Sequence, residues 1–208
     1  ISIATYDNYH AEQVIKCIKN NKHVFVEKPL CLNLNELKAI VKALNEKNTI
    51  RLSSNFVLRS YSVFKELKDL ITRGDLGEIY YIEGDYNYGR LEKLTEGWRG
   101  KIPDYSITLG GGMHLIDLMS WILDRKIKSV ISAGNKIATK RSDFKNFDLI
   151  TSILKFENGI IGKLTSNFAC STKHHHCLRV YGTEGTFLYT TQGMSYVFNK
   201  SNTLSSQN

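Results

Sequence analysis

The stretch His23-Val24-Phe25-Val26-Glu27-Lys28-Pro29 determines how the first part of the chain is interpreted. Its β-branched and aromatic residues predict a short strand, and Pro29 biases Lys28 toward extended geometry rather than the start of a helix. In open α/β sheets, ligands bind at the carboxyl ends of the strands. Lys28 is therefore a candidate for a ligand crevice; the alternative is an ordinary surface lysine beside a strand end.

Strands and helices alternate around this stretch. The expected elements are a strand at residues 1–4, a helix from Asp7 or Asn8 to Lys19, the strand just described, a helix that Asn33 and Glu36 begin with a capping box, and a strand at residues 50–56. This order indicates a parallel sheet with crossover helices.

Beyond residue 57 the pattern changes from crossover helices to strands. The elements expected here are a helix at residues 63–71 with Gly74 as its C-cap, a helix at 113–123, and strands at 79–86, 130–138, 149–156, 160–167, 178–181, 186–189 and 196–198. Asn158-Gly159 predicts a hairpin turn. The expected fold class is α/β followed by α+β. Residues 1–56 would be the last part of a doubly wound domain, and residues 57–208 an incomplete domain with an open, mostly antiparallel sheet and flanking helices.

Composition excludes several classes of protein. Hydrophobic residues make up 42% of the 208 and charged residues 23%, which is typical of globular domains rather than disordered chains. No apolar run is long enough to cross a membrane. Ile1 to Thr5 lacks the basic start of a signal peptide and is interpreted as a chain entered within a strand. The four cysteines have neither disulfide-framework nor zinc-site spacing, so a reducing cytoplasm is expected.

The net charge of +8 favours an anionic ligand, either a dinucleotide or a nucleotide-linked sugar. Nucleic acid is the rival explanation. The lysines are, however, spread through the chain, and no basic block with interleaved aromatic residues occurs. A nucleic-acid partner is therefore not expected.

Three glycines precede a histidine in the segment that runs from Leu109 to Met119. Consecutive glycines permit close approach of the backbone to a ligand or a neighbouring strand. His114 and Asp117 are three residues apart on the predicted helix, so they share a face and are expected to interact. A histidine oriented by a carboxylate is a candidate general acid or base. The alternative is a buried histidine that only satisfies a helix end.

Two further segments are weaker candidates. Residues 86–93 mix tyrosines with Arg90 and Lys93, which suits a sugar that carries a carboxylate or phosphate, or else a solvated loop. Residues 174–177 read His-His-His-Cys, but His174 and His176 would face one side of a strand and His175 the other, so no metal site is expected. One of these histidines is a candidate for the substrate cleft.

Taken in chain order, these pieces form a recognisable set. The set comprises an Ala-Thr strand end at residues 4–5, His10 five residues later, Glu27-Lys28-Pro29, Asn55 near a strand end, the segment from Gly74 to Ile79, the glycine-rich His114-x-x-Asp117 helix and the segment from Tyr181 to Thr186. Over nearly the whole chain, this order resembles the Gfo/Idh/MocA family, that of glucose–fructose oxidoreductase and inositol dehydrogenase.

The resemblance implies a Rossmann domain that holds NAD or NADP, followed by an open sheet that supports the substrate pocket and often forms the subunit interface. On the cofactor side, it implies that Thr5 and His10 line the site, that Glu27 lies near the nicotinamide ribose, and that Asn55 lies where cofactor and substrate meet. Lys28 would contact the reacting hydroxyl. The expected partners are a sugar, sugar nucleotide or cyclic polyol as substrate and further copies of the chain as a homo-oligomer.

On the substrate side, the resemblance implies that His114 is the acid/base and that Asp117 is a pocket or orienting residue. Arg90 and Lys93 would lie near the substrate entrance. The expected reaction is hydride transfer between a secondary alcohol carbon and the nicotinamide, with removal of the hydroxyl proton.

Two features depart from the family pattern. Many members have Asp four residues before the histidine, where this chain has Gly110, which puts an Asp–His proton relay in doubt. The glycine-rich phosphate loop would lie upstream of Ile1, so the chain as given is expected to bind dinucleotide poorly or not at all. A catalytically silent sugar-binding or regulatory relative is therefore the alternative to a dehydrogenase.

Overall fold

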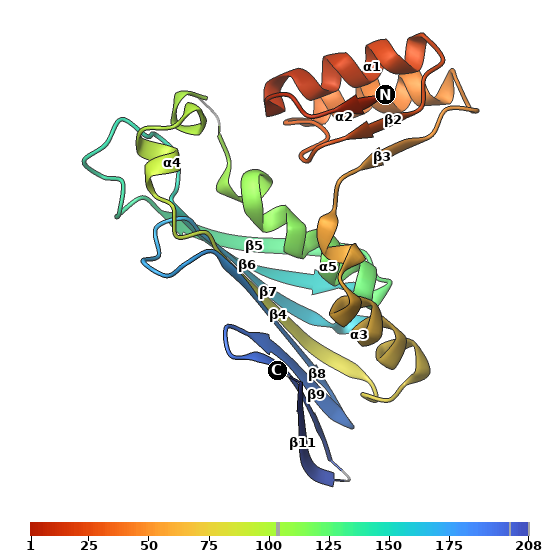
Figure 1. The fold of residues 1–208 in the computed structure, drawn as a ribbon, viewed down its shortest axis with the longest axis vertical. Helices are drawn as coiled ribbons and strands as arrows, with labels where there is room; N and C mark the ends of the chain where they lie inside the picture. Colours follow the sequence, from red (N-terminus) through yellow and green to blue (C-terminus); the bar gives the residue numbers. More distant parts are fainter. Residues whose placement is uncertain (103–104, 200, 208) are drawn as a thin grey trace. The chain divides into compact units, whose positions relative to one another are not determined.

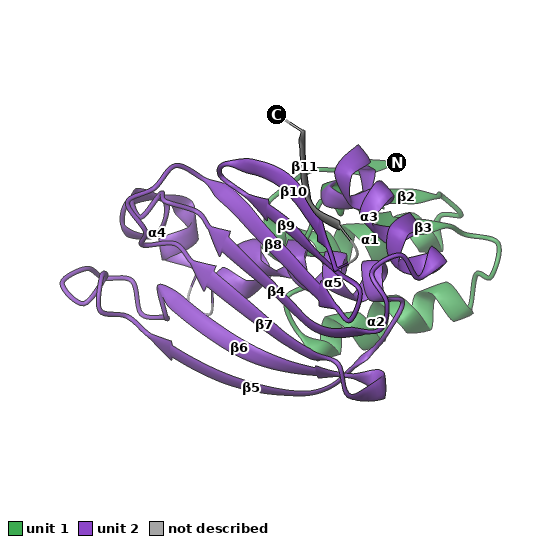
Figure 2. Cartoon of the chain, turned by 90° about the horizontal axis from the view of Figure 1, so that it is seen from below, with its two compact units in different colours: residues 1–57 green, residues 58–208 purple. Residues whose placement is uncertain are grey.

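The structure is a computed structural model that describes residues 1–102, 105–199 and the backbone of 201–207. The chain divides into two compact units, Ile1–Val57 and Leu58–Asn208, which are coloured separately in Figure 2. The sequence predicted a boundary one residue earlier, between residues 56 and 57. Each unit has its own hydrophobic core and is described by itself.

The first unit is a three-stranded parallel sheet in the order β1-β2-β3. Its elements are β1 (Ser2–Ile3), a 3₁₀ turn (Asp7–Tyr9), α1 (His10–Lys19), β2 (Val24–Val26), α2 (Leu34–Asn45) and β3 (Leu52–Ser54). Phe25 lies opposite Ser2 on one side and Ser53 on the other. Val24 and Val26 pack with the buried faces of the two helices, whereas Phe25 is exposed. The parallel sheet with crossover helices is confirmed.

The two helices of this unit begin differently. For α2 the predicted cap is confirmed, because the Asn33 side chain accepts a hydrogen bond of 3.0 Å from the Glu36 amide. The Glu36 carboxylate accepts in turn from the Leu32 amide at 2.7 Å. For α1 the prediction of a cap at Asp7 or Asn8 is wrong. The 3₁₀ turn leads into the helix: the Tyr9 amide donates to the Tyr6 carbonyl, and the His10 amide donates to the Asp7 carbonyl.

The second unit is built on an eight-stranded sheet in the order β11-β10-β9-β8-β4-β7-β6-β5. Its strands are β4 (Ile79–Asn87), β5 (Ile127–Asn135), β6 (Leu149–Phe156), β7 (Ile161–Asn167), β8 (His175–Gly182), β9 (Gly185–Thr190), β10 (Gly193–Phe198) and β11 (Ser201–Gln207). Every neighbouring pair is antiparallel except β4 with β7. The mostly antiparallel sheet is therefore confirmed.

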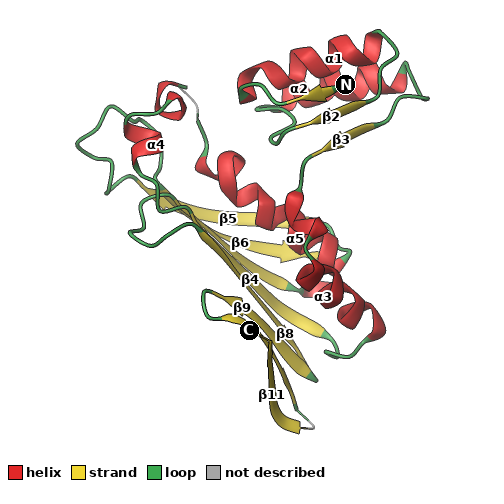
Figure 3. Cartoon of the chain, viewed as in Figure 1, coloured by secondary structure: helices red, strands yellow, loops and turns green. Residues whose placement is uncertain are grey.

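Two longer helices, α3 (Ser62–Arg73) and α5 (Met113–Leu123), lie on one face of this sheet (Figures 1 and 3). The shorter helical pieces are 3₁₀ turns at Val57–Ser60, Trp98–Lys101 and Glu157–Gly159, helix α4 (Glu92–Thr95) and a π-helical turn at Thr108–Gly112. On β4, Ile82 and Tyr86 point toward the helices and are buried, whereas Glu83 and Asp85 point to the other face. We call these the helix-covered face and the outer face.

The predicted turns are present, and two predicted strand boundaries are not. Gly74 ends α3 in the left-handed conformation, and Asn158-Gly159 forms the hairpin turn with positive φ at both residues. The strand expected at 130–138 is β5 at 127–135, because α5 ends at Leu123 and the chain enters the sheet at once. The polar stretch beyond residue 199 contains β11, which pairs with β10. Residues 103, 104, 200 and 208 lie outside the described part.

Phe64 fixes α3 to the sheet, and its loss is expected to be costly. The side chain is fully buried, and its ring lies 5.2 Å from that of Tyr189 on β9. We predict that Phe64→Ala lowers the free energy of unfolding of this unit by about 3–5 kcal/mol, the usual range for a buried phenylalanine. The matched control is Phe147→Ala, because Phe147 is 49% exposed. Urea unfolding followed by tryptophan fluorescence reports on this unit, which contains both tryptophans, Trp98 and Trp121. Equal losses in the two variants would contradict the prediction.

Candidate functional site

The first group of candidate residues lies at the carboxyl ends of the three parallel strands. Glu27 and Lys28 directly follow β2, and Asn55 directly follows β3. The Asn55 side chain donates a hydrogen bond of 2.6 Å to the Glu27 carboxylate, and the Glu27 amide donates to the Ile3 carbonyl at 2.9 Å. The structure thus links Glu27 and Asn55, two residues that lie 28 positions apart and were both predicted to line the cofactor side.

Thr5 lines an open groove of about 520 Å³ just beyond the end of β1. The other lining residues are Ala4, Tyr6, Tyr9 and Gln13. The Thr5 hydroxyl donates to the Gln13 side chain at 2.9 Å, and the Tyr6 and Tyr9 rings are about half exposed. A groove with aromatic walls and amide and hydroxyl groups at the carboxyl edge of a parallel sheet fits part of a nicotinamide dinucleotide.

His10 does not lie in this groove. Its side chain is fully buried, with Nδ1 2.7 Å from the Pro29 carbonyl oxygen and Nε2 3.1 Å from the Thr5 carbonyl oxygen. The imidazole therefore contacts the backbone of Thr5, which lines the groove, and that of Pro29, which follows Lys28. A direct contact of His10 with a cofactor, as the resemblance implied, remains a prediction.

The second group of candidate residues surrounds the π-helical turn in the second unit. π-Helical turns are rare and often mark functional sites. The three glycines let this turn lie directly on its neighbours, because an added Cβ would come 1.9 Å from the Tyr105 hydroxyl at Gly110, 2.3 Å from the Tyr86 ring at Gly111 and 2.1 Å from the Ser166 hydroxyl at Gly112. The sequence predicted that the glycine backbone would lie close to a ligand or a neighbouring strand. In the structure it lies close to Tyr105 and to two side chains of the sheet. His114 follows as the second residue of α5.

Three histidines and Tyr86 gather beside this turn, a group that we call the histidine cluster. The Tyr86 ring centroid lies 6.4 Å from that of His114, 5.2 Å from His174 and 5.0 Å from His176. The His176 ring also lies 4.9 Å from His174 and 6.5 Å from His114. The sequence placed His174 and His176 on one strand face, but it contained no signal that Tyr86 and His114 would join them.

Burial decides the electrostatics of the histidine cluster. It is the main cause that lowers the pKa of His176 to about 4, with smaller contributions from His174 and His114. Burial also lowers the pKa of His174, together with the charge of Arg90, and raises that of the Tyr86 hydroxyl. The buried Nε2 of His176 has no hydrogen-bond partner among the described residues. At neutral pH, His174 and His176 are therefore uncharged.

Asp117 has a partner that the sequence did not suggest. Its two carboxylate oxygens accept hydrogen bonds from Arg59, at 2.7 Å from Nε and 2.5 Å from Nη2. Arg59 lies in the 3₁₀ turn before α3, 58 residues earlier, and its guanidinium also lies 5.9 Å from the centre of the Trp121 ring. The carboxylate expected to orient His114 is thus held by Arg59. An orienting contact from Asp117 to His114 remains a prediction.

The two predicted cations near the substrate entrance have different surroundings. The Arg90 guanidinium lies 5.2 Å from the centre of the Tyr88 ring, and this ring lies 5.2 Å from that of His174. Arg90 is therefore adjacent to the histidine cluster. Lys93 is exposed on α4, and both remain predicted substrate contacts.

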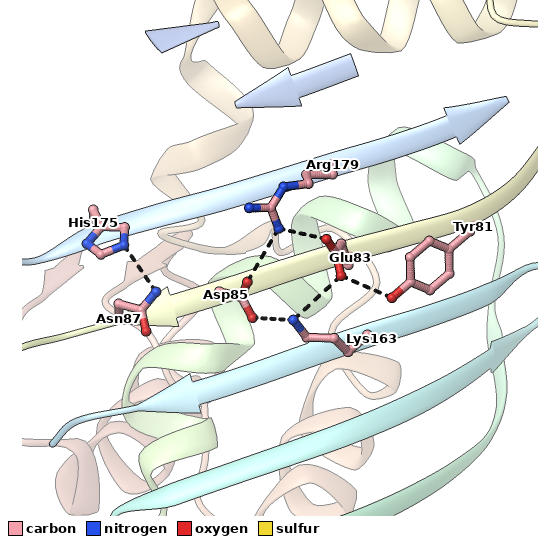
Figure 4. Close-up of polar contacts among 7 residues, drawn as sticks. All are labelled: Tyr81, Glu83, Asp85, Asn87, Lys163, His175 and Arg179. Carbon is pink, nitrogen blue, oxygen red and sulfur yellow. Dashed lines mark hydrogen bonds and ion pairs between the residues drawn. The ribbon is translucent and has the colours of Figure 1, made fainter. Parts of the chain in front are cut away.

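The outer face of the sheet carries an ion network instead of a helix (Figure 4). Lys163 lies 2.7 Å from Asp85 and 3.6 Å from Glu83, and Arg179 lies 2.6 Å from Glu83 and 3.8 Å from Asp85. Tyr81 donates to Glu83 at 3.1 Å; burial and this hydrogen bond raise its pKa to about 12. The network contains two anions and two cations, so it is close to neutral. His175 also faces this side, where its Nε2 lies 3.1 Å from the Asn87 amide.

The described residues contain no group of three or more His, Cys, Asp or Glu side chains placed to hold a metal ion. Among the same residues, no helix combines the length and the apolar composition needed to span a bilayer.

Comparisons with known proteins identify the class to which this fold belongs. Residues 1–56 match the model of an oxidoreductase family with an NAD-binding Rossmann fold, and residues 64–188 match that of the GFO/IDH/MocA C-terminal domain. The two matches define the class as an oxidoreductase family with an NAD-binding Rossmann fold. The chain belongs to the Gfo/Idh/MocA family.

Individual relatives are distant. The chain is 24% identical to myo-inositol 2-dehydrogenase of Thermotoga maritima, over 89% of this chain and 54% of that protein. It is 26% identical to 2,7-anhydro-N-acetylneuraminate hydratase of Escherichia coli, over 89% of this chain and 50% of that protein. An inositol dehydrogenase homologue from Azotobacter vinelandii, solved with NADH and myo-inositol, has the same fold (TM-score 0.85, 20% identity, 100% of this chain and 55% of that one). The chain spans about half the length of the relatives it matches.

The low pKa of His176 predicts a pH-dependent stability. Between pH 6.5 and 4 the unfolded chain protonates this imidazole and the folded unit does not, so the free energy of unfolding falls as the pH falls. At 1.36 kcal/mol per pKa unit, the loss attributable to His176 reaches about 3 kcal/mol at pH 4. We expect His176→Gln to flatten the pH dependence of urea unfolding, followed by tryptophan fluorescence, over this range. Superimposable slopes for the variant and the parent chain would contradict this.

Proposed function

We propose that the protein transfers hydride between a nicotinamide cofactor and a secondary alcohol of a sugar, sugar nucleotide or cyclic polyol. The observation that carries the proposal is the arrangement of Glu27, Lys28 and Asn55 at the carboxyl ends of adjacent parallel strands in a Rossmann-type unit. The inositol dehydrogenases among the relatives support a polyol or sugar as substrate. NAD(P) would supply the hydride acceptor at the nicotinamide.

The protein's own residues would handle the proton and the oxygen. The Lys28 ammonium would donate a hydrogen bond to the reacting hydroxyl and stabilise negative charge on its oxygen as the proton leaves. His114 would accept this proton during oxidation and return it during reduction. Glu27 and Asn55, which are hydrogen-bonded to each other, would form the wall beside the nicotinamide ribose. The proposal requires that Lys28 and His114 reach the same substrate.

Asp117, Arg90 and Lys93 would contact the substrate away from the reacting carbon. Neutral His174 and His176 next to His114 favour an uncharged, hydroxyl-rich part of the substrate. Arg90, which is exposed, would meet any anionic group at the outer end, such as the phosphates of a sugar nucleotide.

A catalytically silent sugar-binding relative is the second candidate. Gly110 supports it, because the position that carries a carboxylate in many family members has no side chain here and faces the Tyr105 hydroxyl instead. The two candidates differ in one measurement, the change in absorbance of NAD(P)H when the full-length gene product is mixed with inositols, sugars and sugar nucleotides. A bound sugar without any turnover would favour the silent relative.

His114→Ala provides the first test of the assignment. A positioned acid/base contributes about 10²–10⁴-fold in rate, so we expect kcat of the full-length gene product to fall by that factor. His23→Ala is the control, because His23 is exposed and its Nδ1 accepts from the Arg51 amide at the other end of β2. A normal kcat in His114→Ala would overturn the role of this residue.

We further propose that the outer face forms the interface of a homo-oligomer, in a reducing cytoplasm that fits the four free cysteines. Ile131, Ile153 and Ile161 are 77%, 45% and 38% exposed and lie on the same face as the ion network. Exposed aliphatic side chains on three neighbouring strands are typical of an interaction surface. The near-neutral network allows this face to meet its own copy in a symmetric dimer.

Negative charge introduced on the outer face is expected to dissociate the proposed homo-oligomer. We predict that Ile131→Glu combined with Ile153→Glu converts the full-length gene product to single chains, because two carboxylates per copy would be buried without partners. The control is Ile137→Glu, at a residue that is 68% exposed outside the strands. Light scattering after gel filtration measures the mass. A parent protein that is already a single chain would contradict the interface.

A further inference from the structure

His10 is the buried titratable side chain in the first unit that the proposed mechanism does not use. It is the first residue of α1 and is fully buried. Its two ring nitrogens lie within hydrogen-bond distance of two backbone carbonyl oxygens, Pro29 at 2.7 Å and Thr5 at 3.1 Å. A buried imidazole with a defined partner at each nitrogen is held in one orientation.

The two carbonyls belong to the segments that carry the proposed function. Thr5 follows β1 and lines the groove, and Pro29 is the residue directly after Lys28. On the amino side of Lys28, two hydrogen bonds fix Glu27. Its amide donates to the Ile3 carbonyl, and its carboxylate accepts from the Asn55 side chain. The backbone of Lys28 is thus held on one side by Glu27 and on the other by His10.

We propose that His10 is a positioning residue that acts through its Nδ1 contact with the Pro29 carbonyl. This contact sets the place of Lys28, and therefore turnover. This inference rests on the proposed role of Lys28 at the reacting hydroxyl.

The two ring nitrogens of His10 are not equivalent. An imidazole with one N–H group donates to one of the two carbonyls only. The shorter distance, to Pro29, indicates that Nδ1 is the donor.

Two isosteric substitutions separate the contacts. The amide nitrogen of asparagine takes a place close to Nδ1, and that of glutamine a place close to Nε2. His10→Asn retains a donor toward the Pro29 carbonyl, whereas His10→Gln moves the donor toward the Thr5 carbonyl. Each variant offers one amide donor to a buried carbonyl, so the two form a matched pair for stability. The corresponding changes at exposed His23, at the other end of β2, are the controls.

The experiment measures kcat, the Kd for NADH and amide hydrogen exchange of residues 27–31 in the full-length gene product. A misplacement of about 1 Å costs up to roughly 10²-fold in rate. We therefore expect His10→Gln to lower kcat 10- to 100-fold and to speed exchange at residues 27–31, with Kd changed less than threefold. His10→Asn, which keeps the donor toward Pro29, is expected to leave kcat and the Kd for NADH within about threefold of the parent protein and exchange at these residues unchanged.

Lys28→Ala distinguishes failure of this inference from failure of the proposed function. If Lys28→Ala retains normal turnover, the proposed function is overturned. If Lys28→Ala loses turnover and the two His10 variants lower kcat equally, the positioning role of the Pro29 contact is overturned. Exchange at residues 27–31 that is unchanged in His10→Gln would also overturn it, independently of activity.

Discussion

The structure of the second unit depends on a close approach of helix and sheet that glycines permit. Gly111 and Gly112 of the π-helical turn lie directly on the side chains of Tyr86 and Ser166, and a methyl group at either glycine would overlap them. On the strand side, Gly84 of β4 leaves room for Met119 of α5, whose Cε lies 2.6 Å from the place of an added Cβ. The approach is therefore close both at the turn before α5 and within α5. This close approach brings His114 beside the rings of Tyr86 and His176.

The same constraint gives Gly110 a structural meaning. An added Cβ there would come 1.9 Å from the Tyr105 hydroxyl, so residue 110 and Tyr105 compete for one volume. A carboxylate at residue 110 would require Tyr105 to move. The rings of Tyr86 and His176 are among the neighbours of His114. If His114 is the acid/base, it works among weakly polar groups whose burial disfavours additional positive charge.

Local sequence patterns predicted most helices, strands and turns, because nearby residues determine where these elements begin and end. Gly74 and Asn158-Gly159 adopt positive φ as their sequences require, and α5 spans the predicted residues. Burial of His10 had a local signal as well, because it lies four and eight residues before the buried Val14 and Ile18 on one helix face. The contact between Arg59 and Asp117, in contrast, had no signal in the local sequence. Their contact depends on how α3 and α5 pack on the sheet, which residue spacing does not encode.

Strand alternation predicted that His174 and His176 would share a side, but the choice of side came from pairing. β8 places His176 opposite Tyr86 of β4, and Arg179 opposite Glu83. A shift of one residue would exchange these two sets of side chains between the faces. It would move Arg179 to the helix-covered face and His176 to the outer face. The burial of Leu178 and Val180 of β8 on the helix-covered face opposes such a shift, since both would become exposed.

The register of β4 with β8 therefore serves both proposed roles of this unit. On the helix-covered face it assembles uncharged rings around His114, where a neutral polyol would have to lose its water. On the outer face it places Arg179 within reach of both carboxylates of β4, while Lys163 reaches them from β7. Desolvating a charge is costly unless oppositely charged groups already contact it. Because each carboxylate has two cations within 4 Å, covering this face with a second copy would cost less than covering isolated charges.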